Sequence, residues 1–290
     1  MTRMIHRTQR SLVASLALSV LCAAALVSGP GTIAGASTPQ GGTAPDEFDP
    51  KNFGNPASGK STWLPLAPGY QTVKEGKVNR GHRRLSHRVV TTVTDVTKEI
   101  NGVRAVAILD QEINGGEVGE QAVDFMAEDK AGNVWLLGSY TEAYEGGEFV
   151  NATDAWLAGV DGSEPGLLMP ARPTKRTPEW VQEDTSQEGM STAAVFETGV
   201  RDCVPFKCYK KVLVIKEGDE LKYFARGVGG IRTKPESAGG ENETEELINF
   251  TKLSPVGLKE MGDEVLRLDE NASTASEDVF GPSEPAKRTL

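Results

Sequence analysis

The sequence contains few of the side chains that most often act as nucleophiles, general bases or transition-metal ligands. Its 290 residues include three histidines and three cysteines. His82 and His87 both lie in the arginine-rich stretch NRGHRRLSHR, which predicts an exposed segment. No G-x-S-x-G motif, phosphate-binding loop or dinucleotide fingerprint occurs. We therefore predict no catalytic, cofactor-binding or metal-binding residues and no cofactor.

Positive charge is also scarce. The chain has 31 Lys and Arg against 41 Asp and Glu, a formal net charge of −10. Nucleic acids and anionic lipid surfaces are poor partners for such a chain, because affinity for phosphate comes from Lys and Arg. Cations and basic partners remain compatible with this charge.

Long apolar runs are absent except at the N-terminus, where one predicts an export signal. The first ten residues carry three arginines and no acid, and an apolar run follows at residues 11–27. The triplet Ala34-Gly35-Ala36 fits the small-x-small rule for cleavage before Ser37. Loss of residues 1–36 removes three arginines and no acids, so the mature net charge is −13. We expect a secreted or cell-envelope protein without a membrane span in the mature chain.

Two alternatives to cleavage remain. A membrane anchor is one, but the apolar run of 17 residues is at the lower limit for crossing hydrocarbon, and no basic residues follow it. Lipid attachment at Cys22 is the other, although Leu21 stands where a lipobox has a small residue.

The stretch from Ile100 to Tyr144 predicts three strands joined by tight turns. Asn101-Gly102 and Asn114-Gly115-Gly116 separate apolar-rich runs, and such pairs supply the positive φ that hairpin turns require. A third turn is predicted at residues 130–133. We expect a mainly β protein with a curved antiparallel sheet or half-barrel, arranged as a meander.

A helix is predicted near the C-terminus, where Ser254-Pro255 is a typical helix start and apolar residues recur at Leu258, Met261, Val265 and Leu268. We expect this helix to pack on the sheet. The predicted organisation is a signal peptide at 1–36, a flexible stalk at 37–60, a β domain at 61–253, the amphipathic helix at 254–270 and a disordered tail at 271–290.

Cys203 and Cys208 flank a short loop between two strand-like runs and are the cysteines left after cleavage. In an oxidising compartment they predict a disulfide across a hairpin. A redox motif would have the closer C-x-x-C spacing, and a zinc site would need further ligands.

The segments VDFMAEDKAGNVWLLG, PGLLMPARP and KYFARGVGGIR resemble those of a family of uncharacterised secreted, β-rich bacterial proteins, especially from actinobacteria, with DKxGNVW and GVG motifs. The resemblance covers roughly residues 62–253 and brings no catalytic residues with it. Its tyrosine-rich strand that runs into Gly-Val-Gly is also similar to strand ends of LolA-like lipoprotein carriers. That similarity implies a curved antiparallel sheet, lined by a helix, which holds an acyl chain.

Two acidic groups suggest cation binding. Asp129 and Asn133 resemble part of a calcium loop, but Ala131 removes a ligand and no bidentate Glu follows, so a hairpin turn is the simpler interpretation. Glu120, Asp124 and Glu128 share one face of a predicted strand, and we interpret this face as solvent-exposed, with a metal or basic partner as the alternative.

Several aromatic residues suggest an apolar cavity. We predict that Phe125, Trp135, Tyr140 and Tyr223 line it, the alternative being that they fill the core. The leading functional hypothesis is a secreted, monomeric, non-enzymatic protein that holds a lipid or another apolar small molecule between sheet and helix. The second is an envelope protein that binds a cation or basic partner through an acidic surface, and the third is a hydrolase.

Overall fold

The computed structural model describes residues 47–80, 83–186, 189–237 and 243–289; the predicted export signal lies outside these ranges. The fold is a large open antiparallel sheet that is not closed into a barrel, with helices at the C-terminal end. No helix within the described ranges is long and apolar enough to cross a membrane. The elements are η1 (Pro50–Asn52), β1 (Tyr70–Arg80), β2 (Arg83–Ile100), β3 (Val103–Asn114), β4 (Glu117–Glu128), β5 (Val134–Glu145), β6 (Glu148–Leu157), β7 (Gly166–Met169), β8 (Trp180–Thr185), β9 (Gly189–Cys203), β10 (Cys208–Glu217), β11 (Glu220–Ala225), β12 (Gly229–Pro235), β13 (Thr244–Lys252), α1 (Pro255–Ala275), α2 (Glu277–Phe280) and β14 (Lys287–Arg288).

The predicted meander is confirmed. Strands β2 to β5 follow one another in the sheet as antiparallel neighbours. The first turn has the positive φ that its sequence predicts, 48° at Asn101 and 75° at Gly102. A two-residue turn of this kind matches the right-handed twist of the strands on both sides, which explains why this local signal was sufficient.

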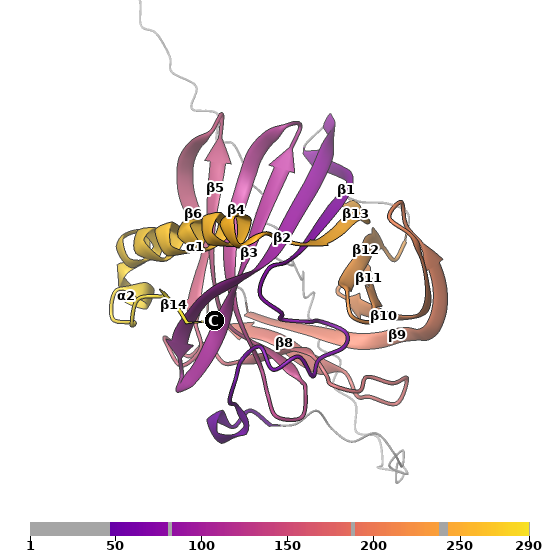
Figure 1. Cartoon of the computed structure of the whole chain (residues 1–290), viewed down its shortest axis with the longest axis horizontal. Helices are drawn as coiled ribbons and strands as arrows, with labels where there is room; N and C mark the ends of the chain where they lie inside the picture. Colours follow the sequence, from indigo (N-terminus) through magenta and orange to yellow (C-terminus); the bar gives the residue numbers. More distant parts are fainter. Residues whose placement is uncertain (1–46, 81–82, 187–188, 238–242, 290) are drawn as a thin grey trace, which may run out of the picture.

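The sheet continues from β1 into the second half of the chain, and this connection turns it into a curved layer. The strand order is β6-β5-β4-β3-β2-β1-β13-β12-β11-β10-β9-β8, with β7 paired to β5 and β14 to β2. Figure 1 shows β9 to β12 wrapping round at one side while β8 runs beneath the first strands. Residues of β8 and β11 can therefore face those of β3 and β4.

Helix α1 covers one face of the first half of the sheet (Figure 1). It begins where the sequence predicts, with Ser254 as N-cap accepting a hydrogen bond from the Gly257 N–H. Its buried residues Val265, Leu268 and Ala272 belong to the same apolar cluster as Phe125 of β4. The space between sheet and helix is thus filled with side chains.

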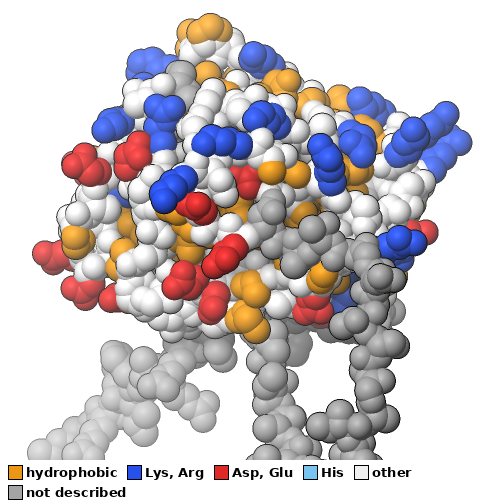
Figure 2. Space-filling model, turned by 90° about the horizontal axis from the view of Figure 1, so that it is seen from below, with side chains coloured by type: hydrophobic (Ala, Val, Ile, Leu, Met, Phe, Trp, Pro, Cys, Tyr) orange, Lys and Arg blue, Asp and Glu red, His pale blue; other side chains and the backbone are white. Residues whose placement is uncertain are grey.

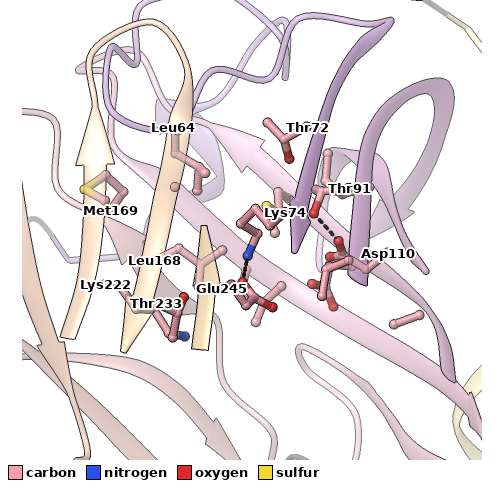
Figure 3. Close-up of a pocket in the computed structure, with 18 of the residues that line it drawn as sticks. Leu64, Thr72, Lys74, Thr91, Asp110, Leu168, Met169, Lys222, Thr233 and Glu245 are labelled. Carbon is pink, nitrogen blue, oxygen red and sulfur yellow. Dashed lines mark hydrogen bonds and ion pairs between the residues drawn. The ribbon is translucent and has the colours of Figure 1, made fainter. Parts of the chain in front are cut away.

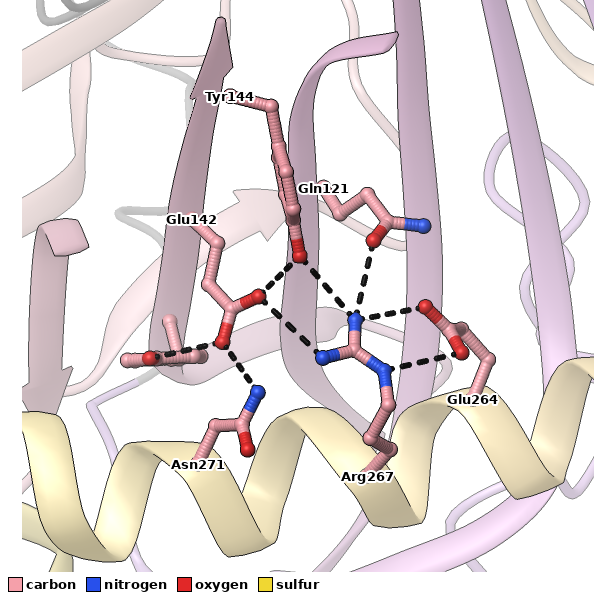
Figure 4. Close-up of polar contacts among 7 residues, drawn as sticks. Gln121, Glu142, Tyr144, Glu264, Arg267 and Asn271 are labelled. Carbon is pink, nitrogen blue, oxygen red and sulfur yellow. Dashed lines mark hydrogen bonds and ion pairs between the residues drawn. The ribbon is translucent and has the colours of Figure 1, made fainter. Parts of the chain in front are cut away.

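A hydrogen-bonded network also joins α1 to the sheet (Figure 4). Arg267 Nη2 donates to Gln121 Oε1 at 3.1 Å, and Asn271 donates to the buried Glu142 at 2.9 Å. Arg267 Nη1 lies 3.6 Å from the Glu142 carboxylate. These contacts give a buried carboxylate the polar partners that it needs.

The structure differs from the predicted disordered tail at 271–290. Helix α1 continues to Ala275, α2 follows, and β14 pairs with β2. Lys98 Nζ donates to Asp269 Oδ1 at 2.8 Å and to the Glu284 carbonyl at 2.7 Å, and Phe280 is buried. The polar composition of the tail predicts disorder. Its order depends on contacts with Lys98 of β2, which is far away in the sequence and gives no local signal.

The described part of the predicted stalk, residues 47–60, also packs on the domain. Phe48 and Phe53 contact the Trp135 ring, with centroids 5.4 and 6.4 Å away. The Phe53 backbone forms a bridge with Asp129. Two aromatic residues therefore attach a segment whose Gly, Pro and Ser content predicts flexibility.

The predicted disulfide is confirmed. Cys203 ends β9, Cys208 begins β10, and the two are directly opposite in the antiparallel ladder with Cα atoms 3.9 Å apart. The bond closes the β9–β10 hairpin at its loop end.

Candidate functional site: an acid-lined cavity

A cavity of about 540 Å³ lies on the face of the sheet opposite α1. Successive side chains of a strand point to opposite faces. On β4, Val123 and Phe125 are in the apolar cluster that meets α1, whereas Ala122, Asp124 and Met126 line the cavity. The volume is within the usual range for a small-molecule site, roughly 300–1,000 Å³.

The wall formed by β1 to β6 changes in character along the strands. Residues paired across neighbouring strands form rows that run across this wall. The first row, at the acidic end, contains Lys74, Val89, Glu112 and Glu120; the second contains Thr72, Thr91, Asp110, Ala122, Thr141 and Asp154; the third contains Val93, Ile108, Asp124 and Ser139; the fourth contains Met126 and Leu136. The first three rows of this wall thus carry carboxylates, and the fourth row, at the other end, is apolar.

The opposite wall repeats this change. On β11, Glu220, Lys222 and Phe224 all line the cavity, in order from the acidic to the apolar end. Leu64, Leu168 and Met169 add further apolar surface, and Figure 3 shows Leu64 and Met169 apart from Asp110. The cavity is therefore amphipathic.

Carboxylates greatly outnumber bases in this cavity. Among the described residues its lining has ten carboxylates and three basic side chains. The carboxylates are Asp110, Glu112, Glu120, Asp124, Asp154, Glu183, Glu217, Glu220, Glu243 and Glu245, and the bases are Lys74, Lys222 and Arg232. Some are paired: Lys74 contacts Glu245, and the Thr91 hydroxyl donates to Asp110 (Figure 3).

Other cavity carboxylates have one buried oxygen without a partner. Within the described part of the chain, Glu112 Oε2, Asp154 Oδ1 and Glu243 Oε2 are buried and accept no hydrogen bond. Burial and the neighbouring Glu120 and Glu243 raise the pKa of Glu112 to about 8. An unpaired buried carboxylate is costly, so these groups favour a proton or an external cation.

Asp124 shows the same crowding in the middle of the cavity. Burial and the nearby carboxylates of Asp110, Asp154 and Glu183 raise its pKa to about 8. A hydrogen bond from Ser139 lowers the pKa but does not outweigh them. Asp110 and Asp154 are in the same row but three strands apart, roughly 14 Å at the usual strand spacing. A single ion cannot contact both.

His87 lies at the acidic end, where its buried ring contacts two carboxylates. Its Nε2 is 3.1 Å from both Glu243 Oε1 and Glu245 Oε1, and its Nδ1 is 2.7 Å from Asn114 Oδ1. Burial disfavours the charged ring, but the bonds to Glu243 and Glu245 outweigh this and raise the pKa of His87 to about 10. His87, Glu243 and Glu245 have the composition and spacing of a candidate metal-ligand set.

A glycine allows His87 and Glu245 to meet. His87 is on β2 and Glu245 on β13, with β1 between them, and Gly76 of β1 is paired with both. A side chain at this position would separate the imidazole from the carboxylate. A Cβ on Gly76 would also lie 1.5 Å from the Thr244 carbonyl oxygen.

The four aromatic residues predicted to line a ligand site lie outside the cavity wall. Phe125 and Tyr140 pack against Phe280 of α2, with centroids 6.4 and 5.6 Å away. Trp135 donates through Nε1 to Asp129 at 3.2 Å. Tyr223 lies beside Lys234, whose Nζ is 5.4 Å from the ring centroid. Their role in ligand binding stays a prediction.

Asp129 forms the hairpin turn that its sequence favours. Its Oδ1 accepts from the N–H groups of Ala131, Gly132 and Asn133 at 2.8–2.9 Å. Its Oδ2 accepts from the Asn133 amide at 2.7 Å. Both oxygens are therefore used within the turn.

No motif in the sequence indicates His87, Lys74 or Glu245 as site residues. A signal for His87 was nonetheless present, because Leu85, His87 and Val89 alternate with Ser86 and Arg88, which indicates an inward face. We predict exposure for His87 from the arginines around it, but the ring is 1% exposed. The alternation of side chains along β2 therefore predicts the burial of His87 better than the neighbouring arginines do.

The outer surface carries both signs of charge. On the face seen in Figure 2, Lys and Arg gather over the upper and right parts, and Asp and Glu at the left and lower middle. Ten carboxylates of the described residues line the cavity, so part of the acidic character predicted for the surface lies inside it.

Comparisons with known proteins identify two solved structures of related shape. A candidate lipoprotein from Parabacteroides distasonis matches with a TM-score of 0.37 and 10% identity, over 66% of this chain and 99% of its own. A candidate exported protein with a YmcC-like fold from Bacteroides fragilis matches with a TM-score of 0.35 and 13% identity, over 66% of this chain and 100% of its own. At these values the likeness carries no argument about function. No family model matches the chain, and no curated protein matches it significantly.

Proposed function

We propose that this chain is an exported, non-enzymatic binding protein that holds an amphiphilic cation in the cavity. Such a ligand has an amine or another cationic group joined to an apolar body. The observation that carries the proposal is the change along one continuous wall from Glu112 and Glu120 at one end to Met126 and Leu136 at the other.

The charge of the cavity supports a cationic group. Glu112 Oε2 and Asp154 Oδ1 are buried acceptors without a described partner. An ammonium group has three N–H donors and a positive charge, so it can satisfy one such acceptor and offset the repulsion among the carboxylates near it. A carboxylate or phosphate ligand would add to that repulsion.

The length and apolar end of the cavity support an extended body. From Glu112 to Val106, which is opposite Met126, β3 advances six residues, roughly 20 Å at the usual rise per residue. Leu168, Met169 and Phe224 enclose the far end. An alkyl chain there would bury its surface, at about 0.8 kcal/mol per methylene group.

This proposal joins the two leading hypotheses from the sequence but changes the position of the ligand. The ligand occupies the face opposite α1, since Phe125 and Leu268 fill the space between sheet and helix. Export is supported by the basic and apolar N-terminal residues and by the Cys203–Cys208 disulfide, a bond that persists in oxidising compartments.

Calorimetric titration of the protein with dodecylamine tests the proposal. Ala122→Phe places a ring in the middle of the cavity and is expected to weaken binding at least tenfold. Asp124→Asn removes a central carboxylate and should weaken binding several-fold. Glu117→Gln, on the same strand but exposed and outside the cavity, is the matched control. Circular dichroism verifies that each variant is folded. Unchanged affinity in a folded Ala122→Phe variant would contradict the proposal.

A further inference from the structure

We propose that His87, Glu243 and Glu245 form a binding site for one divalent ion of the first transition row. The ligand atoms are His87 Nε2, Glu243 Oε1 and Glu245 Oε1, which lie within 4.8 Å of one another. This site concerns a ligand different from the amphiphilic cation and does not depend on the proposed function.

The distances suit a shared ion. Nε2 is 3.1 Å from each of the two carboxylate oxygens. Zinc bonds to nitrogen and carboxylate oxygen are about 2.0–2.2 Å long, so two ligand atoms on one tetrahedral ion lie roughly 3.3 Å apart. Small side-chain movements would therefore convert three hydrogen-bonding atoms into three metal ligands.

The donor set selects the class of ion. One imidazole nitrogen with two carboxylate oxygens suits zinc, cobalt(II), iron(II) or manganese(II). Calcium and magnesium prefer oxygen ligands alone. Three protein ligands leave at least one coordination position for water or for another group within the cavity.

The surroundings of His87 orient it as a metal ligand. Asn114 Oδ1, 2.7 Å from Nδ1, accepts a hydrogen bond from the Nδ1–H, and Nε2 faces the two carboxylates. A metal-bound histidine usually donates its other ring N–H to an oxygen acceptor of this kind, which fixes the orientation of the ring. Gly76 keeps the space between His87 and Glu245 clear.

The remaining carboxylate oxygens also favour a bound cation. Lys74 contacts Glu245 Oε2, so one of the two ligand carboxylates has a fixed orientation. Glu243 Oε2 and Glu112 Oε2 are buried without a partner among the described residues, and the Glu243 side chain is 11% exposed. A divalent ion would offset this local excess of negative charge.

Cobalt(II) titration of the chelator-treated protein tests the site, since visible absorption bands report the ligands and geometry of the bound ion. We expect one equivalent to bind and zinc to displace it. Glu243→Gln and His87→Gln should each weaken binding at least 100-fold, and Asn114→Ala by about tenfold or more. Glu220→Gln, another cavity carboxylate outside the set, should change affinity less than threefold.

Glu243→Gln is the decisive variant, because Glu243 precedes β13 and its replacement keeps the side-chain volume. Thermal unfolding without metal verifies the fold of each variant. Absence of saturable cobalt binding, or equal binding by wild type and folded Glu243→Gln, would overturn the site. Asp124→Asn should bind cobalt normally, so loss of dodecylamine binding and loss of metal binding are distinguishable outcomes.

Discussion

The imidazole of His87 and the carboxylate of Glu245 meet across a strand that separates them, with Nε2 3.1 Å from Oε1. Strand β1 lies between β2 and β13, and its residue opposite both is Gly76. A buried polar contact thus joins two residues that are 158 positions apart in the sequence.

Replacement of Gly76 by alanine is expected to destabilise the protein strongly. The new Cβ would be 1.5 Å from the Thr244 carbonyl oxygen, so β1 and β13 must separate. Overpacking typically costs about 1–3 kcal/mol, and we expect the upper end of that range because the obstacle is backbone. Urea unfolding measures the loss. Gly54→Ala, whose Cβ would have no atom within 4 Å, is the control. Equal midpoints for the two variants would refute this explanation.

The buried pair Lys98 and Asp269 should be costly to break. The Lys98 side chain is 2% exposed and that of Asp269 7%, with Nζ 2.8 Å from Oδ1. Asp269→Asn leaves a buried ammonium without its counterion, which typically costs about 3–5 kcal/mol. The Ala286 N–H also loses its charged acceptor, so the C-terminal segment should exchange amide hydrogens faster.

The matched control for this pair is the exposed contact between Arg88 and Glu75, whose side chains are 46% and 47% exposed. Glu75→Gln should change the unfolding free energy by about 1 kcal/mol or less. A double replacement of Lys98 and Asp269 by Met and Leu should recover much of the loss seen in Asp269→Asn. Equal losses of unfolding free energy in Asp269→Asn and Glu75→Gln would show that the buried pair contributes no more to stability than the exposed one.

Stability without ligand should fall as the pH rises, because of Asp124. The pKa of this carboxyl is raised from 3.8 to about 8 in the folded protein by burial and by Asp110, Asp154 and Glu183. The folded state therefore binds the proton more tightly than the unfolded state. The resulting stabilisation is fully present below about pH 4 and is lost as the pH approaches about 8.

Urea unfolding between about pH 5 and about pH 8 measures this effect. Asp124→Asn should reduce the decline in unfolding free energy across that range, since the amide does not titrate. Glu117→Gln, at an exposed position on the same strand, should reproduce the wild-type decline. Parallel curves for wild type and Asp124→Asn would show that the aspartate ionises normally.

The disulfide between Cys203 and Cys208 should contribute modest stability. It closes a loop with a sequence separation of five, so the chain-entropy model gives about 2 kcal/mol. The double replacement of both cysteines by serine should lower the unfolding free energy by this amount. A reductant should produce the same change in the wild type and none in the double variant.

Local signals in the sequence were sufficient for the meander and for the start of α1. Asn101-Gly102 determines a turn between adjacent strands, and Ser254-Pro255 begins α1, because each depends on residues a few positions apart. The pairing of β1 with β13 has no such signal. It depends on the curvature of the whole sheet, to which distant segments contribute.

The candidate site likewise depends on contacts between segments that are distant in the sequence. Alternation on β4 correctly places Glu120 and Asp124 on one face, but Glu128, at the end of the strand, does not line the cavity. Glu128 instead accepts hydrogen bonds from the backbone of Lys60 and Ser61. We interpret the acidic face as solvent-exposed, and it becomes a cavity wall only because β8 and β11 fold over it.

The most direct test of the account is the difference in affinity between dodecylamine and dodecanoate, which have the same chain length and opposite charges. Both are titrated calorimetrically into the wild-type protein at neutral pH, with dodecanol as the uncharged reference. The amphipathic, acid-rich cavity predicts that dodecylamine binds at least tenfold more tightly than dodecanol, and that dodecanoate binds more weakly than either. Equal affinities, or tighter binding of dodecanoate, would contradict the central claim.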